Sequence, residues 1–493
     1  MRIEDARPLI AEAVTLLLDG KNEIGLPDLN IEGMAEFLAR AREMKMEREQ
    51  KLLLLDQAAV VLEEFYAHLP FKRARYAVDP VQRLRLLRAD MDQLDDLEFH
   101  GELVKTFSRL RDPHTFYALP RPFSGASAFL PFRIQHYYDG ESDEIRFLIT
   151  HVMRNFVHET FAPGAHITHY NGMPVEEAVW HEAGFDSAGN EDAQFIRGLN
   201  ALFGRALGHT APREEHWAVV QYRPASPNDA EELGILLPWQ VMSGLRPAAG
   251  SGGARSSIFS SQLQTLECRK ALWGWRQLAE EKYADDTYRP NLRRFASVRT
   301  DMARAKKNET RLPALFSYTA TVLQDDAGEV KPSSLRDAKR ADAEYGYLRI
   351  ASFHHEDTNE FLEEARRILN LMNEIAGDGL VLDVRSNPGG NINAAEGLLQ
   401  MLTPRDIQPA QFHFMNSKTT RDIALQLAET KKNRTAAAQQ FDEWKEGLIA
   451  SLAEGSTLTP GRPLTRPAEA NKIGQVYQGP VVLLIDALSY SAT

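Results

Sequence analysis

Cysteine is almost absent from this sequence of 493 residues, in which Cys268 is the only one. A single thiol excludes an internal disulfide and any zinc site built from several thiolates. The residues around Cys268 carry no signature of a nucleophile, so we interpret it as a buried or incidental thiol.

Patterns for binding metals and phosphates are missing as well. The histidines have no metal-ligand spacing, and there is no His-Glu-x-x-His pattern. The glycine-rich residues 248–257 lack the Gly-Lys-Ser/Thr ending of a phosphate-binding loop, and a mobile loop is the simpler interpretation. We therefore expect neither a metal nor a cofactor.

Long apolar runs and an excess of positive charge are also missing. No apolar stretch is long enough to span a bilayer, and the N-terminus lacks the basic-then-apolar pattern of a secretory signal. The net charge of −12 disfavours nucleic acid, because phosphate binding needs concentrated lysine and arginine. We expect a cytoplasmic protein with neither a membrane nor a nucleic-acid partner. An extracytoplasmic location is the alternative if a signal has been removed.

What is present is typical of a globular protein of several domains, with 43% hydrophobic and 26% charged residues. Helical periodicity predicts an N-terminal helical region over residues 1–112. Alternating apolar and polar residues predict a β-rich region over 113–245, with strands at 129–138, 144–152 and 216–222. Residues 246–340 are interpreted as a mixed linker or cap.

Residues 341–493 have an α/β pattern. The predicted strands are 345–353, 379–384 and 481–485, and the predicted helices are 359–376, 393–402 and 420–452. Strands that alternate with helices indicate a mainly parallel sheet with crossover helices.

A glycine pair, Gly389 and Gly390, follows the strand that ends near residue 384. Paired glycines leave backbone N–H groups unshielded, and the start of a helix adds positive potential. Such a turn suits an oxyanion hole, whose donors must point at developing negative charge. A turn that needs glycine for geometry alone explains the pair equally well.

Two serines, Ser489 and Ser491, follow the strand at 481–485. A small-residue turn after a buried strand is where a nucleophile can be exposed. A serine hydroxyl needs a base to take its proton, and by themselves two serines in a turn are usually structural. Ser489 could also cap a following helix.

A third segment, residues 110–117, contains the turn opener Asp112-Pro113 followed by His114. Histidine suits general-base catalysis near neutral pH. A lone histidine in a loop is more often non-catalytic, so this segment by itself decides nothing.

Taken together, these segments resemble the C-terminal-processing (tail-specific) serine peptidases and their tricorn-type relatives. The matching motifs are Asp-Pro-His-Thr (112–115), a segment like the end of a PDZ-type module (164–175), Gly-x-Leu-x-Ile-x-x-Phe (346–353), Leu-Asp-x-Arg-x-Asn-x-Gly-Gly (382–390) and the Ser-Tyr-Ser-Ala-Thr end (489–493). The resemblance implies a PDZ-like module within 113–245 and a crotonase-like core over 341–493.

The resemblance also implies roles for single residues. Ser491, rather than Ser489, would be the nucleophile. Backbone N–H groups near Gly389 and Gly390, together with that of Ala492, would hold the oxyanion.

The identity of the base stays open. Most of these peptidases use a lysine a turn or more of helix beyond the serine, but only Ala492 and Thr493 follow Ser491 here. In the tricorn-type branch a histidine of the Asp-x-His-Thr-like segment is the base, which assigns the role to His114. Tyr490 and Thr493 depart from the small residue and the serine usual at their positions. We expect the core to be incomplete at its C-terminal end.

The leading hypothesis is a serine endopeptidase that hydrolyses polypeptides, near their C-termini, through an acyl-enzyme on Ser491. An alternative is a catalytically incomplete or inactive peptide-binding scaffold of the same fold, which the missing end of the core favours for this chain. A crotonase-like acyl-CoA enzyme ranks below both, because it would need neither the Ser-Tyr-Ser-Ala end nor a PDZ-like module. The partners expected are polypeptide substrates, and the sequence indicates no oligomeric state.

Overall fold

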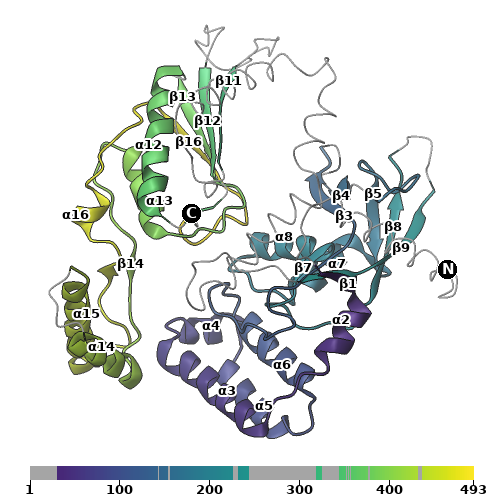
Figure 1. Ribbon diagram of the computed structural model, residues 1–493, viewed down its shortest axis with the longest axis horizontal. Coiled ribbons are helices and arrows are strands. Elements are labelled where there is room, and N and C mark those ends of the chain that lie inside the picture. The colour runs from purple at the N-terminus through teal and green to yellow at the C-terminus, as the bar shows by residue number, and fades with distance from the viewer. Residues whose placement is uncertain are drawn as a thin grey trace. The chain divides into compact units, whose positions relative to one another are not determined.

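The computed structural model divides the chain into two compact units, which are described separately (Figure 1). Unit 1 is Met1–Trp275 with His413–Pro460, and unit 2 is Arg276–Phe412 with Gly461–Thr493. The structure describes residues 30–140, 142, 144–153, 156–225, 231–243, 318–324, 344–350, 352, 353, 355, 357–375, 378–430 and 436–493. Cys268 and the glycine-rich residues 248–257 lie outside these ranges, as does most of 246–340. The predicted domain boundaries stay predictions.

The part of unit 1 between Arg48 and Ser108 is helical. Its helices are α3 (Arg48–Val60), the π-helical turn η1 (Val61–Phe65), α4 (Leu69–Tyr76), α5 (Pro80–Asp90) and α6 (Asp96–Ser108). Asp79 caps α5, and Asp95 forms a capping box with Glu98 at the start of α6. The apolar faces meet in one core that contains Leu62, Leu84 and Phe99.

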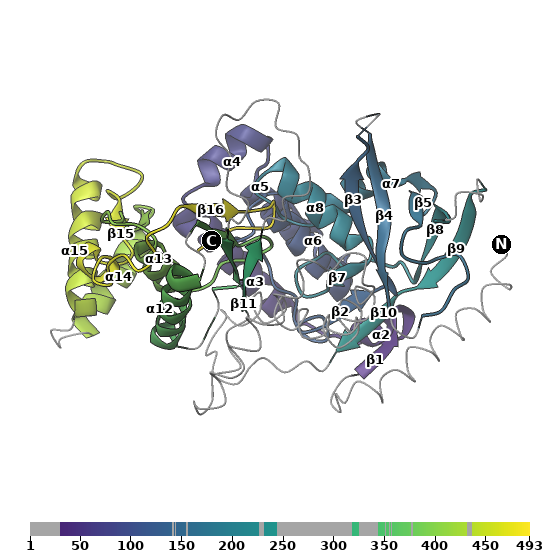
Figure 2. The same cartoon turned by 90° about the horizontal axis from the view of Figure 1, so that it is seen from above.

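Two antiparallel sheets follow in unit 1. One has the order β1-β10-β2-β7, formed by Asn30–Gly33, Gln240–Ser243, Ser127–Phe129 and Gly204–Ala206. The other has the order β3-β4-β5-β8-β9, formed by Phe132–Tyr138, Ile145–Val152, His166–Tyr170, Trp217–Arg223 and Leu233–Pro238, and β6 (Met173–Pro174) pairs with β5. Helices α2 (Met34–Ala41), α7 (Val175–Ala183) and α8 (Glu191–Ala201) belong to the same unit (Figure 2).

The prediction of one continuous strand over residues 129–138 is wrong. Residues 129–138 form the end of β2 and the whole of β3, which lie in different sheets. Pro131 stands between them and has no N–H to donate to a ladder, so the pairing changes there. Between β5 and β6 the chain makes a tight turn, in which Asn171 and Gly172 both have positive φ, at 49° and 81°.

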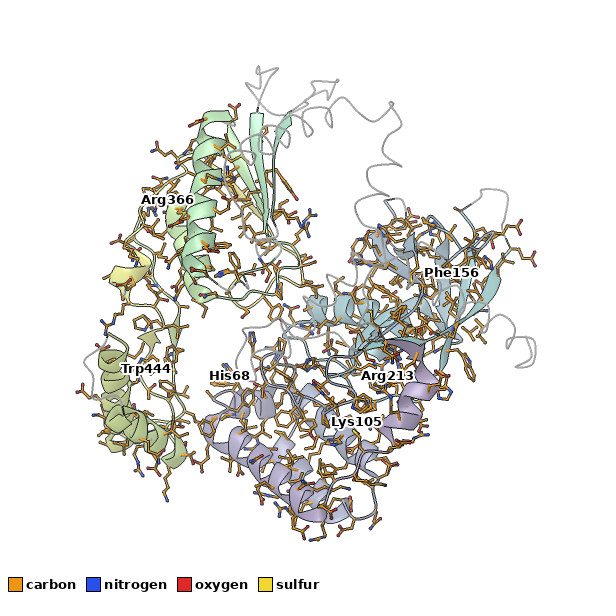
Figure 3. All side chains as sticks on the ribbon, viewed as in Figure 1. His68, Lys105, Phe156, Arg213, Arg366 and Trp444 are labelled. Atoms are coloured by element: carbon orange, nitrogen blue, oxygen red, sulfur yellow. The ribbon has the colours of Figure 1, made fainter. Side chains whose placement is uncertain are left out.

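The predicted helix over 420–452 is also wrong, because this segment forms two helices. They are α14 (Lys418–Thr430) and α15 (Ala436–Ala453). A single helix of that length would be about 50 Å long and would leave its apolar face uncovered. The two helices pack on each other. Trp444 of α15, labelled in Figure 3, also meets the ring of Phe414, which precedes α14, edge-on with 5.3 Å between the ring centres.

Unit 2 contains the α/β pattern that the sequence predicts. Its sheet has the order β11-β12-β13-β16, formed by Tyr318–Gln324, Glu344–Ile350, Gly379–Asp383 and Val481–Leu484. Strands β12, β13 and β16 are parallel, whereas β11 is antiparallel to β12. Helices α12 (Thr358–Ile375) and α13 (Ile392–Met401) lie beside this sheet and share its core (Figures 1 and 2).

Three short elements complete unit 2: β14 (Gln411–Phe412), β15 (Arg462–Pro463), which pairs with it, and α16 (Pro467–Ala470). Within the described ranges, no helix is both long enough and apolar enough to cross a bilayer.

Candidate active site

The parallel pairing of β13 with β16 places the two segments predicted for catalysis next to each other. Asp383 pairs with Leu484 at the carboxyl ends of these strands, so the turns that follow both strands start at the same edge of the sheet. Beyond this edge, the N–H of Tyr490 and the hydroxyl of Thr493 both donate to the carbonyl of Asn387, at 3.2 Å each. The glycine turn and the serine turn therefore form one structure.

Ser491 occupies a sharp and strained turn. Its φ is 64°, in the left-handed region that residues with a side chain rarely adopt, and the residue is exposed. The N–H of Thr493 closes the turn on the carbonyl of Tyr490 at 3.3 Å. Strained backbone of this kind clusters at functional sites, and a serine on a tight turn after a strand is the geometry that exposes a nucleophile.

Ser489 has a different environment. Its hydroxyl donates to the carbonyl of Val384 at 2.8 Å and accepts from the N–H of Asp486 at 3.1 Å. A hydroxyl has one proton to donate, so this serine is committed to holding the two turns together. The geometry favours Ser491 over Ser489 as the reactive residue.

Asp486 adds a second tie between the turns. Its carboxylate accepts from the N–H and from the hydroxyl of Ser386, at 2.7 Å each. Burial works against the charged form, but the hydrogen bonds from Ser386 and from the N–H of Leu488 outweigh it and lower the pKa of Asp486. The carboxylate is therefore ionised at neutral pH.

Gly389 is the point of closest approach between the two turns. Its φ is 85°, and a Cβ added there would lie 2.6 Å from the nitrogen of Ala492 and 2.6 Å from the Cβ of Ser491. Both the backbone angle and the space require glycine. Gly389 is therefore needed for the geometry of the turn, which is one of the two explanations that the sequence left open. The close approach also places the backbone nitrogen of Ala492 beside the glycine pair.

The donors that face this site differ in availability. The N–H of Gly389 already donates to the side-chain oxygen of Asn387 at 2.8 Å. In the described part of the chain, neither the N–H of Gly390 nor that of Ala492 donates to another protein atom. These two N–H groups therefore remain the candidates for an oxyanion hole.

Asn387 is a site residue that the sequence reasoning did not single out. It is fully buried, its amide donates to the carbonyl of Ile350 at 3.0 Å, and its own carbonyl holds the serine turn. It thus connects β12, the glycine turn and the serine turn. The signal was present in the Leu-Asp-x-Arg-x-Asn-x-Gly-Gly motif, but its partner on β12 is visible only in the fold.

A buried carboxylate supports the same turn from the end of β13. Asp383 is fully buried and accepts from the Tyr347 hydroxyl at 2.6 Å and from the Arg385 guanidinium at 2.7 Å. Burial alone would raise the pKa of Asp383, but the hydrogen bonds from Arg385 and Tyr347 outweigh it and hold the pKa well below its usual range. Burial, and next to it the hydrogen bond to Asp383, raise the pKa of Tyr347.

We expect Asp383→Asn to destabilise the protein by about 1–3 kcal/mol at pH 7, because it weakens the charged hydrogen bonds from Arg385, Tyr347 and Arg349. The pKa of Asp383 is lowered in the folded state, so its contribution is complete above the unfolded-state pKa of about 3.9 and is lost as pH falls below it. The difference in melting temperature between wild type and variant should therefore shrink between pH 5 and pH 3, roughly the window set by that value. A constant difference in thermal melts over this range would contradict the assignment.

His114 lies in unit 1, on a turn built as the sequence predicts. The N–H of Thr115 donates to the carbonyl of Asp112 at 3.1 Å, with Pro113 at the second position of the turn. The imidazole is exposed, with 57% of the side-chain surface accessible. His114 belongs to unit 1 and Ser491 to unit 2, so the pairing of the two residues stays a prediction.

Comparisons with known proteins bear on the family and the fold. Residues 344–493 match the model of peptidase family S41. The structure is similar to mature CPAF (TM-score 0.56, 18% identity, 90% of this chain and 80% of that chain covered), to CPAF complexed with lactacystin (0.54, 18%, 89% and 79%) and to a CPAF mutant (0.58, 18%, 90% and 80%). At this identity the similarity shows the fold. A search of curated proteins gives no match.

The matched residues contain the whole parallel part of the unit 2 sheet, the glycine turn and the serine turn. The resemblance stated from the motifs is thereby confirmed. Residues 344–493 belong to peptidase family S41, and the protein is a serine-type peptidase.

Proposed function

We propose that the protein is an endopeptidase that hydrolyses polypeptides near their C-termini, through an acyl-enzyme on Ser491. The observation that carries this proposal is the position of Ser491 on a strained, exposed turn that closely approaches Gly389, the neighbour of Gly390. A nucleophile and two unengaged backbone donors at one place are the minimum that acyl transfer requires.

In the proposed reaction, Ser491 Oγ forms a bond to the carbonyl carbon of the substrate while its proton passes to His114 Nε2. The electrons of the carbonyl double bond move to oxygen, where the N–H groups of Gly390 and Ala492 stabilise the charge. When the carbonyl re-forms, the C–N bond breaks and His114 returns the proton to the leaving amine. Water, activated by the same histidine, then hydrolyses the ester.

We further propose that the sheet β3-β4-β5-β8-β9 with α7 and α8 is the PDZ-like module, and that residues 341–493 are the crotonase-like core. In support, β3 is an edge strand, and Phe195 of α8 contacts His136 of β3 at a ring distance of 5.2 Å. An edge strand beside a helix can accept a polypeptide as an added strand. Such a site would select the tail of a substrate.

Fluorophosphonate labelling of the full chain tests the proposed function. We expect one labelled peptide, identified by mass spectrometry as the one containing Ser491, and we expect His114→Ala to reduce the labelling rate at least 100-fold, as the loss of a general base does. His181→Ala is the matched control, because His181 is a half-exposed histidine of unit 1 placed on α7.

Three outcomes contradict the proposal in different ways. Labelling at Ser489 would reassign the nucleophile. Labelling at Ser491 that His114→Ala leaves unchanged would exclude this base. Binding of polypeptides without any labelling would favour the peptide-binding scaffold.

A further inference from the structure

Asp486 stands at the start of the serine turn, two residues after the end of β16. Its N–H donates to Ser489 Oγ at 3.1 Å, and its carbonyl accepts from the N–H of Ser489 at 3.1 Å. Its carboxylate accepts from the N–H of Leu488 at 3.0 Å. These bonds within the serine turn fix the position of the carboxylate.

The same carboxylate binds Ser386 of the glycine turn twice. Oδ1 accepts from the N–H of Ser386 and Oδ2 from its hydroxyl, at 2.7 Å each. Ser386 has a φ of 58°, in the left-handed region that a residue with a side chain keeps only where its surroundings impose it. The two bonds from Ser386 to Asp486 are such surroundings, so Asp486 stabilises the strained backbone at the start of the glycine turn.

The next residues of the glycine turn are in contact with the turn of Ser491. The carbonyl of Asn387 accepts from the N–H of Tyr490 and from the hydroxyl of Thr493. A Cβ added at Gly389 would lie 2.6 Å from that of Ser491, so the two backbones approach as closely as they can. A shift at the start of the glycine turn would therefore displace the residues against which Ser491 packs.

We propose that Asp486 is a positioning residue, whose carboxylate joins the two turns through Ser386 and thereby fixes the position of Ser491. The inference rests on the proposed function, in which Ser491 is the nucleophile. An ionised carboxylate suits this role because it accepts hydrogen bonds on two oxygens, and the N–H groups of Ser386 and Leu488 and the Ser386 hydroxyl can all donate. All of these residues belong to unit 2.

The first test measures the turn and does not depend on activity. In spectra of the full chain labelled with ¹⁵N-tyrosine, the amide signal of Tyr490 is the one lost in Tyr490→Phe. Because this N–H donates to the carbonyl of Asn387, its exchange with solvent shows whether the serine turn stays on the glycine turn. We expect Asp486→Ala to speed this exchange about 10-fold or more. Exchange at the wild-type rate in Asp486→Ala would overturn the inference.

The second test is the rate of fluorophosphonate labelling at Ser491. Asp486→Ala removes every bond of the carboxylate, and we expect a loss of about 100-fold, which a displacement of about 1 Å at a catalytic group can cost. Ser386→Ala removes the hydroxyl and keeps the N–H, so we expect a smaller loss of about 3- to 10-fold. Asp406→Ala is the matched control, because it removes a carboxylate from an exposed position of the same unit and should label at the wild-type rate.

The double variant Ser386→Ala/Asp486→Ala shows whether Asp486 acts through Ser386. If one contact carries the effect of both residues, the double variant should label about as fast as Asp486→Ala alone. Losses that multiply in the double variant would mean that the two residues act independently, which would overturn the inference.

The outcomes separate this inference from the proposed function. Labelling of Ser491 that is lost in His114→Ala and unchanged in Asp486→Ala would overturn the positioning role alone. Absence of labelling at Ser491 in the wild type would overturn the proposed function and the positioning role with it. Thermal melts show whether Asp486→Ala still folds. If it does not, Asp486→Asn carries both tests, with an expected loss of about 10-fold in labelling, because a neutral oxygen accepts hydrogen bonds more weakly than a charged one.

Discussion

Ser491→Ala is expected to lower the rate of polypeptide hydrolysis at least 10⁴-fold, because it removes the atom to which the acyl group bonds. The residual rate would come from the N–H groups of Gly390 and Ala492 and from substrate binding. Ser491 is exposed, so the melting temperature should stay close to that of the wild type. The measurement is release of fluorescence from a labelled unfolded protein, with a thermal melt alongside.

Ser489→Ala is the matched control for this prediction. It removes the hydroxyl that joins Val384 to Asp486, so we expect a loss of about 1–3 kcal/mol in stability and a much smaller loss of activity. Ser491→Ala should therefore lose activity and keep its stability, whereas Ser489→Ala should lose stability and keep most of its activity. Loss of hydrolysis in Ser489→Ala, with Ser491→Ala still active, would contradict the assignment.

The helices and strands of unit 2 were predictable because their signals are local. The apolar strand ending at Asp383 and the amphipathic helix α12 each follow from periodicity within a few turns or residues. The split at Pro131 was also present in the sequence, as a proline inside a strand pattern. The break between α14 and α15 was not, because an amphipathic pattern alone does not say where a helix folds back on its partner.

The residues of the site also differ in whether a local sequence signal identifies them. Ser491 and the glycine pair could be identified by residue type and order along the chain. The contacts of Asn387 depend on a partner distant in sequence, Ile350, so no local pattern contains them. A buried polar residue must find a hydrogen-bond partner, but the sequence does not say which one.

The sequence also does not show which backbone N–H groups are free of hydrogen-bond partners. The sequence treats Gly389 and Gly390 as equivalent, whereas in the described part of the chain the N–H of Gly389 donates to Asn387 and that of Gly390 donates to no protein atom. The two glycines are therefore present for different reasons. Gly389 is required by the space between the two turns, and this difference leads to a second large effect.

Gly389→Ala is expected to destabilise the protein by about 3 kcal/mol or more and to lower the labelling of Ser491 about 100-fold. The new Cβ would lie 2.6–2.7 Å from atoms of Tyr490, Ser491 and Ala492, two of which are backbone atoms that cannot move away cheaply. The positive φ adds a further cost of about 1 kcal/mol. The serine turn must shift, and a displacement of about 1 Å at a catalytic group can cost about 100-fold in rate.

Gly474→Ala separates these two contributions. Gly474 lies in the same unit and has a similar φ of 79°, but nothing lies within 4 Å of its added Cβ. It should therefore show the cost of the backbone angle alone, about 1 kcal/mol, with labelling unchanged. Thermal melts and labelling rates of the two variants decide the matter. If Gly389→Ala melts and labels like Gly474→Ala, the close approach of the two turns does not hold the nucleophile in place.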